Sequence, residues 1–194
     1  MKAQVTECTH IGGREINQDY FSHVIDSDWA LFCVADGLGG HDHGELASQF
    51  FVEALISLSP KYAEDMAAAP SMAMQAMIEE AATLFRKRVD EACPGKDPQT
   101  TLALAWVDPN HFITAHIGDS RIYRIQNNEI IWRSPDHTLV QQLFEEGKIK
   151  EEEMAAHPMQ NRLLKSVSVF EKPEPDIFIH PPLTSDEAVM LCTD

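Results

Sequence analysis

The chain has 194 residues, a formal net charge of -16 and an apolar fraction of 44%. This length and composition fit one soluble globular domain with a substantial core. The acidic balance argues against nucleic acid or anionic membranes as partners and favours divalent cations or basic protein surfaces. The N-terminus lacks the apolar stretch of a secretory signal, and no apolar run approaches the roughly 20 residues of a membrane helix. The four cysteines form no CxxC pair, so we expect reduced thiols and a cytoplasmic protein.

Three clusters of apolar, β-branched and aromatic residues predict the first strands. They lie at Ala3–Cys8, Tyr20–Ile25 and Trp29–Ala35. The glycine-rich stretch VADGLGGHDHG, from Val34 to Gly44, follows the third cluster. Glycines free backbone N–H groups for phosphate binding, but this stretch carries acids and histidines where a nucleotide-binding loop would carry lysine.

Two helices are predicted after this loop from apolar residues at helical spacing. The first begins near Gly44 and has the stripe Ala47, Phe50, Phe51, Ala54, Leu55 and Leu58. The second has the stripe Met74, Met77, Ile78, Ala81 and Phe85, with Ser71 after Pro70 as its expected N-cap. Its methionines are expected in the core rather than on a binding surface.

The remaining strands are predicted from patterns of the same kind, with short turns that indicate antiparallel hairpins. They cover Thr101–Val107, Phe112–Ile117, Arg121–Ile125, Glu129–Arg133, Ile177–His180 and Ala188–Cys192. Thr138 and Gln141 have the spacing of a capping box for a third helix, which Gly147 would end. The acidic run 148–153 is interpreted as a solvated helix face. The order of elements predicts an α+β fold, with helices outside an antiparallel sheet system.

Aspartates end three of these apolar strands: Asp36, Asp119 and Asp194. If the strands share a sandwich, their ends can bring the three carboxylates together. Each aspartate alone is an ordinary turn residue. Clustered carboxylates repel one another and require cations, and an all-oxygen ligand set favours magnesium, calcium or manganese over zinc.

Rival readings of the glycine-rich loop fit less well. A Walker A loop needs lysine after its last glycine, but Gly44 is followed by Glu45, and a GxGxxG frame reaches Asp42 instead of glycine. A zinc pattern of the HxHxDH type would need histidine where the chain has Leu46.

The order of motifs along the chain resembles the bacterial PP2C (PPM) family of metal-dependent Ser/Thr protein phosphatases. The resemblance rests on Arg14-x-x-Asn17-Gln18-Asp19, the stretch 34–41, Thr100-Thr101-Leu102, the stretch 117–123, Pro135-Asp136-His137-Thr138-Leu139-Val140 and Leu191-Cys192-Thr193-Asp194. These motifs stand in family order and span almost the whole chain.

The resemblance implies a four-layer αββα sandwich, in which two antiparallel sheets are flanked by helices and a metal site lies at one end. By motif position, Asp36 resembles the carboxylate that bridges two metals, and the backbone carbonyl of Gly37 resembles a ligand of one. Asp194 resembles a ligand of the other metal. Asp119 resembles the residue that, with Asp194, holds a third and weaker metal. The implied cofactors are two or three Mn²⁺ or Mg²⁺ ions.

The resemblance also assigns residues to the substrate and the water. Arg14 resembles the phosphate-binding arginine, a role suited to its planar fork of donors. Asp19 resembles the acidic residue that orders metal-bound water. The leaving alkoxide needs a proton, which His41 or His43 could supply, and His41 is the preferred catalytic candidate.

The implied function is hydrolysis of phosphoserine and phosphothreonine in proteins, with a Ser/Thr kinase as the opposing partner and no nucleic-acid or membrane partner. Two alternatives stay open: a non-catalytic phosphoprotein-binding module, and a phosphatase of small molecules. The family continues past the motif that ends at Asp194, so residues 1–194 are expected to be a single domain that lacks its C-terminal end. Substrate choice is expected in the segment from about Phe144 to Pro175.

Overall fold

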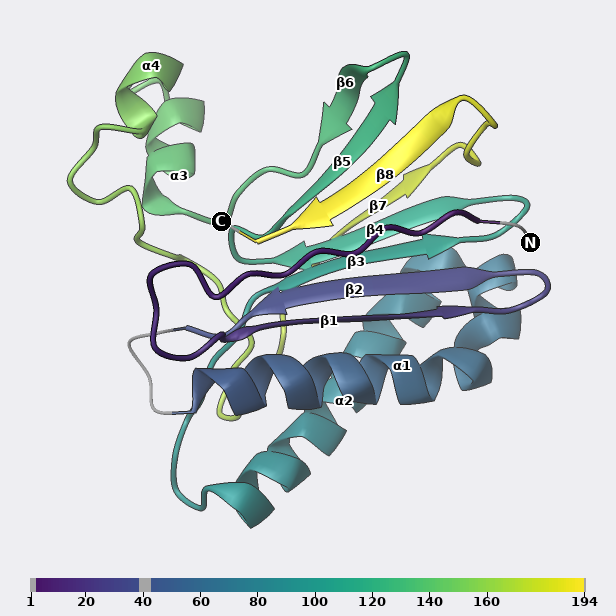
Figure 1. The fold of residues 1–194 in the computed structure, drawn as a ribbon, viewed down its shortest axis with the longest axis horizontal. Coiled ribbons are helices and arrows are strands. Elements are labelled where there is room, and N and C mark those ends of the chain that lie inside the picture. The colour runs from purple at the N-terminus through teal and green to yellow at the C-terminus, as the bar shows by residue number, and fades with distance from the viewer. Residues whose placement is uncertain (1–2, 39–42, 194) are drawn as a thin grey trace.

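The computed structural model describes residues 3–38 and 43–193, which form two antiparallel sheets (Figure 1). The five-stranded sheet has the order β1-β2-β3-β4-β7 and the three-stranded sheet has the order β6-β5-β8. The strands of the first sheet are β1 (Asp19–Ile25), β2 (Ala30–Asp36), β3 (Leu102–Val107), β4 (Phe112–Ile117) and β7 (Asp176–His180). Those of the second are β5 (Arg121–Gln126), β6 (Glu129–Arg133) and β8 (Glu187–Cys192).

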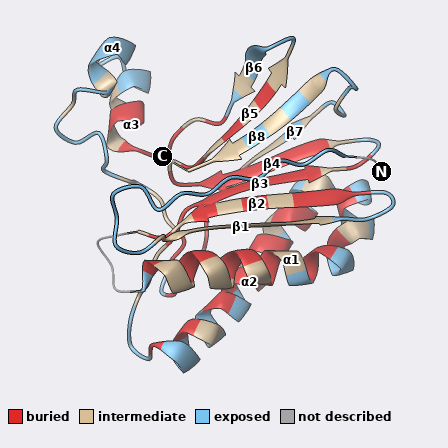
Figure 2. Cartoon of the chain, viewed as in Figure 1, coloured by how far each residue is buried: buried red, intermediate tan, exposed pale blue. Residues whose placement is uncertain are grey.

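Two long helices, α1 (Gly44–Ala68) and α2 (Pro70–Ala92), cover one face of the five-stranded sheet (Figure 1). Successive side chains of a strand point to opposite faces, so alternate residues of β2, β3 and β4 meet these helices. Phe51 of α1 and Phe85 of α2 are fully buried there and meet edge to face at 5.8 Å. Buried residues gather between this helix pair and the sheet (Figure 2). The methionine stripe of α2 belongs to this core, as predicted.

A second, smaller core lies between the two sheets. Its buried members are Ala103, Ala105, Phe112 and Ile122, against which Trp132 and other partly buried residues pack. The opposite faces of β3 and β4 thus serve two cores, which explains why both strands are buried along almost their whole length. Neither strand can show the polar alternation of a solvated sheet.

The predicted α+β class, with two antiparallel sheets and flanking helices, is confirmed. The helices α1 and α2 form one outer layer. The shorter helices α3 (Leu139–Glu145) and α4 (Glu151–Met154) lie at one end of the sheets rather than on the outer face of β5, β6 and β8 (Figure 1). Within residues 3–38 and 43–193, the chain therefore supplies three of the four layers. No helix in this part of the chain is long and apolar enough to cross a membrane.

Most predicted elements are confirmed, with strand boundaries that shift by one residue at most. The strand predicted at Ala3–Cys8 is wrong. This segment is exposed coil, and its apolar residues find no strand partner in the described chain, although Glu7 bonds His23 of β1 at 2.7 Å. A strand requires a neighbour for its backbone groups, which local sequence does not reveal.

The ends of two helices test the capping predictions. Ser71 is not the N-cap of α2, because the helix already begins at Pro70 and Ala69 holds the cap position. Proline suits the first helical position, since its missing N–H has no partner there in any case. At α3, the Thr138 hydroxyl accepts from the Gln141 amide at 3.3 Å, which confirms the predicted N-cap.

Candidate active site

Two carboxylates face each other at one end of the five-stranded sheet. Asp19, the first residue of β1, is the register partner of Asp36, the last residue of β2. Directly opposite residues of an antiparallel pair lie on the same face with Cβ atoms about 4.5 to 5.5 Å apart, and like charges placed so are destabilising. The pair therefore favours a cation, as predicted from the sequence for clustered acids.

The backbone of Asp36 is held by two neighbouring threonines. Its N–H donates to the Thr101 hydroxyl at 2.9 Å, and its carbonyl accepts from the Thr101 amide and the Thr100 hydroxyl, both at 2.9 Å. The next residue, Gly37, forms an isolated bridge with Thr100. These bonds fix where the β2 chain leaves the sheet, and hence where the Asp36 side chain begins.

The glycine-rich loop closes on itself at its base. A Cβ atom at Gly37 would lie 2.1 Å from the carbonyl oxygen of Gly44, so only glycine permits this approach. Gly37 also donates its N–H to the carbonyl of Gln18 at 3.0 Å, and the Ser48 hydroxyl of α1 donates to the same oxygen at 2.6 Å. The start of α1 is thereby joined to the Asp19–Asp36 end of the sheet.

The turn between β4 and β5 carries the third acid, Asp119. The Thr101 hydroxyl, which accepts from the Asp36 N–H, also shares a hydrogen bond of 2.6 Å with the Ser120 hydroxyl, in which either oxygen can be the donor. Gly118 has φ +97°, and a Cβ there would lie 2.7 Å from the Thr101 side chain. One hydroxyl pair thus joins Asp36 to the turn that bears Asp119.

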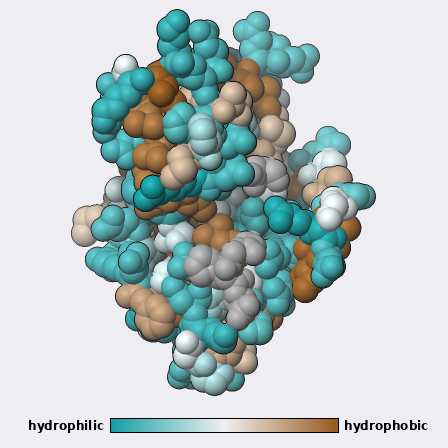
Figure 3. All heavy atoms as spheres, turned by 90° about the vertical axis from the view of Figure 1, so that its left-hand side faces the viewer, coloured by the Kyte–Doolittle hydropathy of each residue, from teal (hydrophilic) through white to brown (hydrophobic). Residues whose placement is uncertain are grey.

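The C-terminal end of β8 reaches the same region, because Cys192 is the register partner of Arg121 at the start of β5. Arg121 in turn makes a bidentate ion pair with the buried Asp136, with Nε at 2.7 Å from Oδ1. Asp194 itself lies outside the described residues. Around the atoms drawn in grey, this side of the molecule is hydrophilic over much of its surface and also carries apolar patches (Figure 3).

Of the residues predicted to bind phosphate or to donate a proton, only Arg14 and His43 lie within the described chain. Arg14 is exposed in the segment before β1, where its N–H donates to the Ile11 carbonyl at 3.2 Å. His41 lies outside the described residues. His43 is exposed and precedes α1 with φ 72°, and its Nδ1 lies 4.0 Å from Glu45. His43 therefore lies at the acidic end of the sheet, next to the contact between Gly37 and Gly44.

Sequence reasoning missed a buried cluster behind the acidic turn. His116 of β4, His137 and Asp176 of β7 offer ligand-type atoms that all lie within 4.8 Å of one another. The two imidazole rings stack at 4.5 Å, and His116 donates from Nε2 to the carbonyl of Pro135 at 2.7 Å. His137 stood in a motif without a role. The only local signal of this cluster was a histidine within an otherwise apolar strand.

Burial controls the protonation of these histidines. It lowers the pKa of His116 to about 4, with His137 adding a smaller effect. Burial also lowers the pKa of His137. Burial alone would raise the pKa of Asp176, but bonds from Lys165 and the contact with His137 outweigh it and the pKa lies below its usual value. Both imidazoles are therefore neutral at neutral pH, beside an ionised carboxylate.

Stability is expected to fall as the pH drops from about 6.5 towards 4. An unfolded histidine titrates near 6.5, whereas His116 titrates near 4 in the fold, so the unfolded chain binds more protons between these values. The full stabilisation is present above pH 6.5, and roughly 3 kcal/mol is lost by pH 4. Melting temperatures are measured against pH for the wild type and for His116→Phe. Because the other titrating groups are the same in both proteins, the difference between the two curves reports His116. Parallel curves would contradict the prediction.

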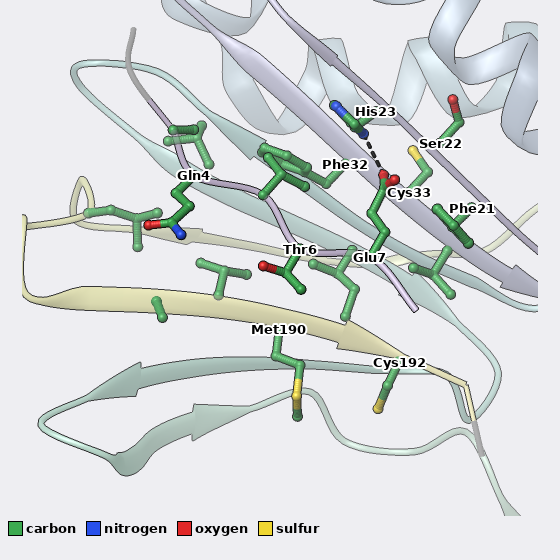
Figure 4. Close-up of a pocket in the computed structure, with 18 of the residues that line it drawn as sticks. Gln4, Thr6, Glu7, Phe21, Ser22, His23, Phe32, Cys33, Met190 and Cys192 are labelled. Carbon is green, nitrogen blue, oxygen red and sulfur yellow. Dashed lines mark hydrogen bonds and ion pairs between the residues drawn. The ribbon is translucent and has the colours of Figure 1, made fainter. Parts of the chain in front are cut away.

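A hollow of about 1120 Å³ runs along the strands, from the acidic end to the turn between β1 and β2, between the N-terminal segment, β1, β2 and β8. Figure 4 shows Phe32 and Phe21 on one side and Met190 on the other, with Glu7 of the N-terminal segment bonded to His23 of β1. Asp19 and Thr193 are among its lining residues. Its walls are largely the strand faces that point between the two sheets, so it is less acidic than the end of the sheet that carries Asp19 and Asp36.

The donor set at the acidic end fits hard divalent cations. Asp19, Asp36 and Asp119 are half-buried carboxylates, and Gly37 adds a backbone carbonyl. Oxygen donors of this kind suit magnesium and manganese. The like charges of Asp19 and Asp36, placed opposite each other in the strand pair, are the observation that favours such an ion here.

Comparison with known proteins tests the resemblance. The chain is 33% identical over 175 residues to the serine/threonine phosphatase stp of Listeria welshimeri, covering 84% of this chain and 65% of that protein. It is 30% identical over 176 residues to the protein phosphatase PhpP of Streptococcus pneumoniae, covering 89% of this chain and 71% of that protein. The chain thus spans slightly less than two thirds of the length of the Listeria relative.

Solved structures agree with the sequence relatives. The crystal structure of the serine/threonine phosphatase PstP/Ppp of Mycobacterium tuberculosis matches with a TM-score of 0.76 and 27% identity, covering 93% of this chain and 73% of that one. The catalytic domain of PstP in complex with two manganese ions matches with a TM-score of 0.69 and 28% identity, covering 93% and 72%. The family model described as protein phosphatase 2C matches residues 8–194. Because this match covers almost the whole chain, the chain belongs to the protein phosphatase 2C family.

Proposed function

We propose that this chain forms the catalytic domain of a bacterial, metal-dependent phosphatase that hydrolyses phosphoserine and phosphothreonine in proteins. The observation that carries the proposal is the opposition of Asp19 and Asp36, joined through Thr101 and Ser120 to the turn of Asp119. The names of the similar bacterial phosphatases support the substrate class.

The proposed metal ligands are the Asp36 carboxylate, the Gly37 carbonyl, Asp194 and, for a third ion, Asp119. Two or three Mn²⁺ or Mg²⁺ ions are the proposed cofactors, and the two manganese ions of the PstP complex support manganese. When bound, such cations supply an activated water at neutral pH and offset the charge of the phosphoryl group. Phosphate-monoester hydrolysis is among the slowest uncatalysed reactions, which explains the need for this assistance.

The chain's own side chains bind and orient the substrate. Arg14 provides a planar fork of donors for two phosphoryl oxygens and leaves the reacting phosphorus accessible. Asp19 accepts a hydrogen bond from the attacking water and so orients it. His41, or His43 in its place, donates a proton to the departing serine or threonine oxygen. No covalent phosphoenzyme is required.

The proposed partners are phosphorylated proteins, with a Ser/Thr kinase as the opposing enzyme, in the cytoplasm. The net charge of -16 supports partners with basic surfaces near the phosphorylated residue. Substrate choice is assigned to residues 144–175, which contain α4 and lead from α3 towards β7.

Phosphate release from a phosphothreonine peptide tests the function. The protein is expressed from its complete gene, beside residues 1–194 alone, and assayed with manganese, magnesium and EDTA. Turnover that needs metal and exceeds the turnover of free phosphothreonine and sugar phosphates is expected. Preference for the small phosphates would indicate a small-molecule phosphatase. Peptide binding without turnover, with metal bound, would indicate a binding module instead.

A further inference from the structure

Both backbone hydrogen-bonding groups of Gly118 are bonded to one residue, His137. The Gly118 N–H donates to Nδ1 of His137 at 3.1 Å, and the Gly118 carbonyl accepts from the His137 amide at 2.9 Å. Gly118 immediately precedes Asp119 and has a left-handed φ of +97°. The direction of the Asp119 side chain therefore depends on this pair of bonds. An amide N–H buried without an acceptor is costly, so the His137 acceptor holds the turn in place.

A second set of contacts orients the His137 ring. Because Nδ1 accepts from Gly118, a neutral ring carries its proton on Nε2, which lies 3.2 Å from Oδ2 of Asp176. Lys165 donates to the other carboxylate oxygen of Asp176 at 2.7 Å. Asp176 is also the register partner of His116, whose ring stacks on His137. The ring is thus held by the Gly118 bond at Nδ1 and by the stacked His116 ring on its face, while the Asp176 carboxylate lies close to Nε2 without hydrogen-bond geometry.

The same contacts argue against a metal ion among His116, His137 and Asp176. The two rings are nearly parallel, with 18° between their planes, so their in-plane lone pairs do not converge on one point. Coordination through Nε2 of His137 would move its proton to Nδ1, where the Gly118 N–H already points. Lys165 adds a positive charge at Asp176. His116 Nδ1 and His137 Nε2 are buried without a hydrogen-bond partner among the described residues, but the parallel rings and the proton positions do not fit coordination of one ion.

We propose that His137 is a positioning residue, whose Nδ1 atom holds the Gly118–Ser120 turn so that Asp119 can bind its metal ion. This inference rests on the proposed function, because it takes Asp119 as a metal ligand. Partners behind a metal ligand commonly change metal affinity by about 10-fold to 100-fold when they are removed. His137 acts one step further back, through the backbone that carries the ligand.

Three substitutions distinguish the effect of losing the Nδ1 acceptor from the effect of disturbing the packing of the ring. His137→Phe keeps a ring to stack on His116 but removes the acceptor. His137→Asn places an amide oxygen close to the Nδ1 position, so it restores the acceptor and loses the contact with Asp176. His116→Phe is the matched control, since it disturbs the same buried stack and removes a bond to Pro135 but leaves Gly118 untouched.

Manganese binding by calorimetry, on the protein from its complete gene, measures the effect without activity. His137→Phe is expected to lower the manganese affinity of one site by about 10-fold or more. This should be the same site whose affinity Asp119→Asn lowers. His137→Asn should stay within about threefold of the wild type, and His116→Phe should lower the melting temperature but not the manganese affinity. In an Asp119→Asn background, His137→Phe should have no further effect, because it acts through Asp119. Exchange of the Gly118 amide proton should be faster in His137→Phe only.

The outcomes separate this inference from the proposed function. If the wild type binds no manganese, or Asp119→Asn leaves binding unchanged, the metal assignment of Asp119 is wrong. If Asp119→Asn weakens binding but His137→Phe does not, His137 has no positioning role. Equal losses in His137→Asn and His137→Phe would also overturn the inference, since the acceptor would not be the cause. Loss of one bound ion in both His116→Phe and His137→Phe would identify the cluster as a metal site instead.

Discussion

Asp36→Asn is expected to abolish phosphate release, with kcat/KM lowered by at least about 1000-fold, which corresponds to roughly 4 kcal/mol of transition-state stabilisation. Asp36 is the central acid of the proposed site. It faces Asp19 across the strand pair, and both its backbone groups are fixed by Thr100 and Thr101. An amide is a weaker ligand for a hard cation than a carboxylate, and without the cation the attacking water stays near its bulk pKa of about 16.

The fold should survive this change, because the amide has nearly the shape of the carboxylate and the backbone bonds of Asp36 do not involve its side chain. Turnover of a phosphothreonine peptide and the rise in melting temperature on adding manganese measure the effect. The wild type should gain about 2.7 kcal/mol of stability at 100 times the dissociation constant, and the variant should gain little. Asp65→Asn, at an exposed position near the end of α1, is the control. Near-normal turnover by Asp36→Asn would refute the site assignment.

Gly37→Ala is expected to destabilise the fold by about 3 kcal/mol or more and to impair metal binding. Its Cβ would lie 2.1 Å from the carbonyl oxygen and 2.3 Å from the carbonyl carbon of Gly44, which are backbone atoms at the start of α1. A flexible side chain could turn aside, but here either α1 or the end of β2 must move. Urea unfolding gives the loss of stability, and a manganese titration gives the change in affinity.

Gly13→Ala is the matched control for this prediction. No atom lies within 4 Å of its added Cβ, and its φ is outside the left-handed range. Its stability should therefore change by less than about 1 kcal/mol. Equal stabilities of Gly37→Ala and Gly13→Ala would show that the base of the loop can open without cost.

Local pattern was sufficient for most elements of this protein. Strands such as β4 and β6 and the stripe of α2 follow from side-chain periodicity, which reports burial on one face directly. The segment at 3–8 has the same kind of composition as a strand but is coil in the described chain. A strand needs a neighbouring strand to hydrogen-bond its backbone, and the local sequence does not show whether such a neighbour is present.

The sequence by itself determined the kinds of residue at the site, since aspartates that follow apolar strands in family order indicate a cation-binding end. Only the tertiary structure decided which atoms meet. The register sets Asp19 against Asp36, a hydroxyl pair links Thr101 to Ser120, and His137 holds both backbone groups of Gly118. These contacts join residues 17 to 19 positions apart, and strand register and loop closure arise from packing of the whole chain rather than from local preference.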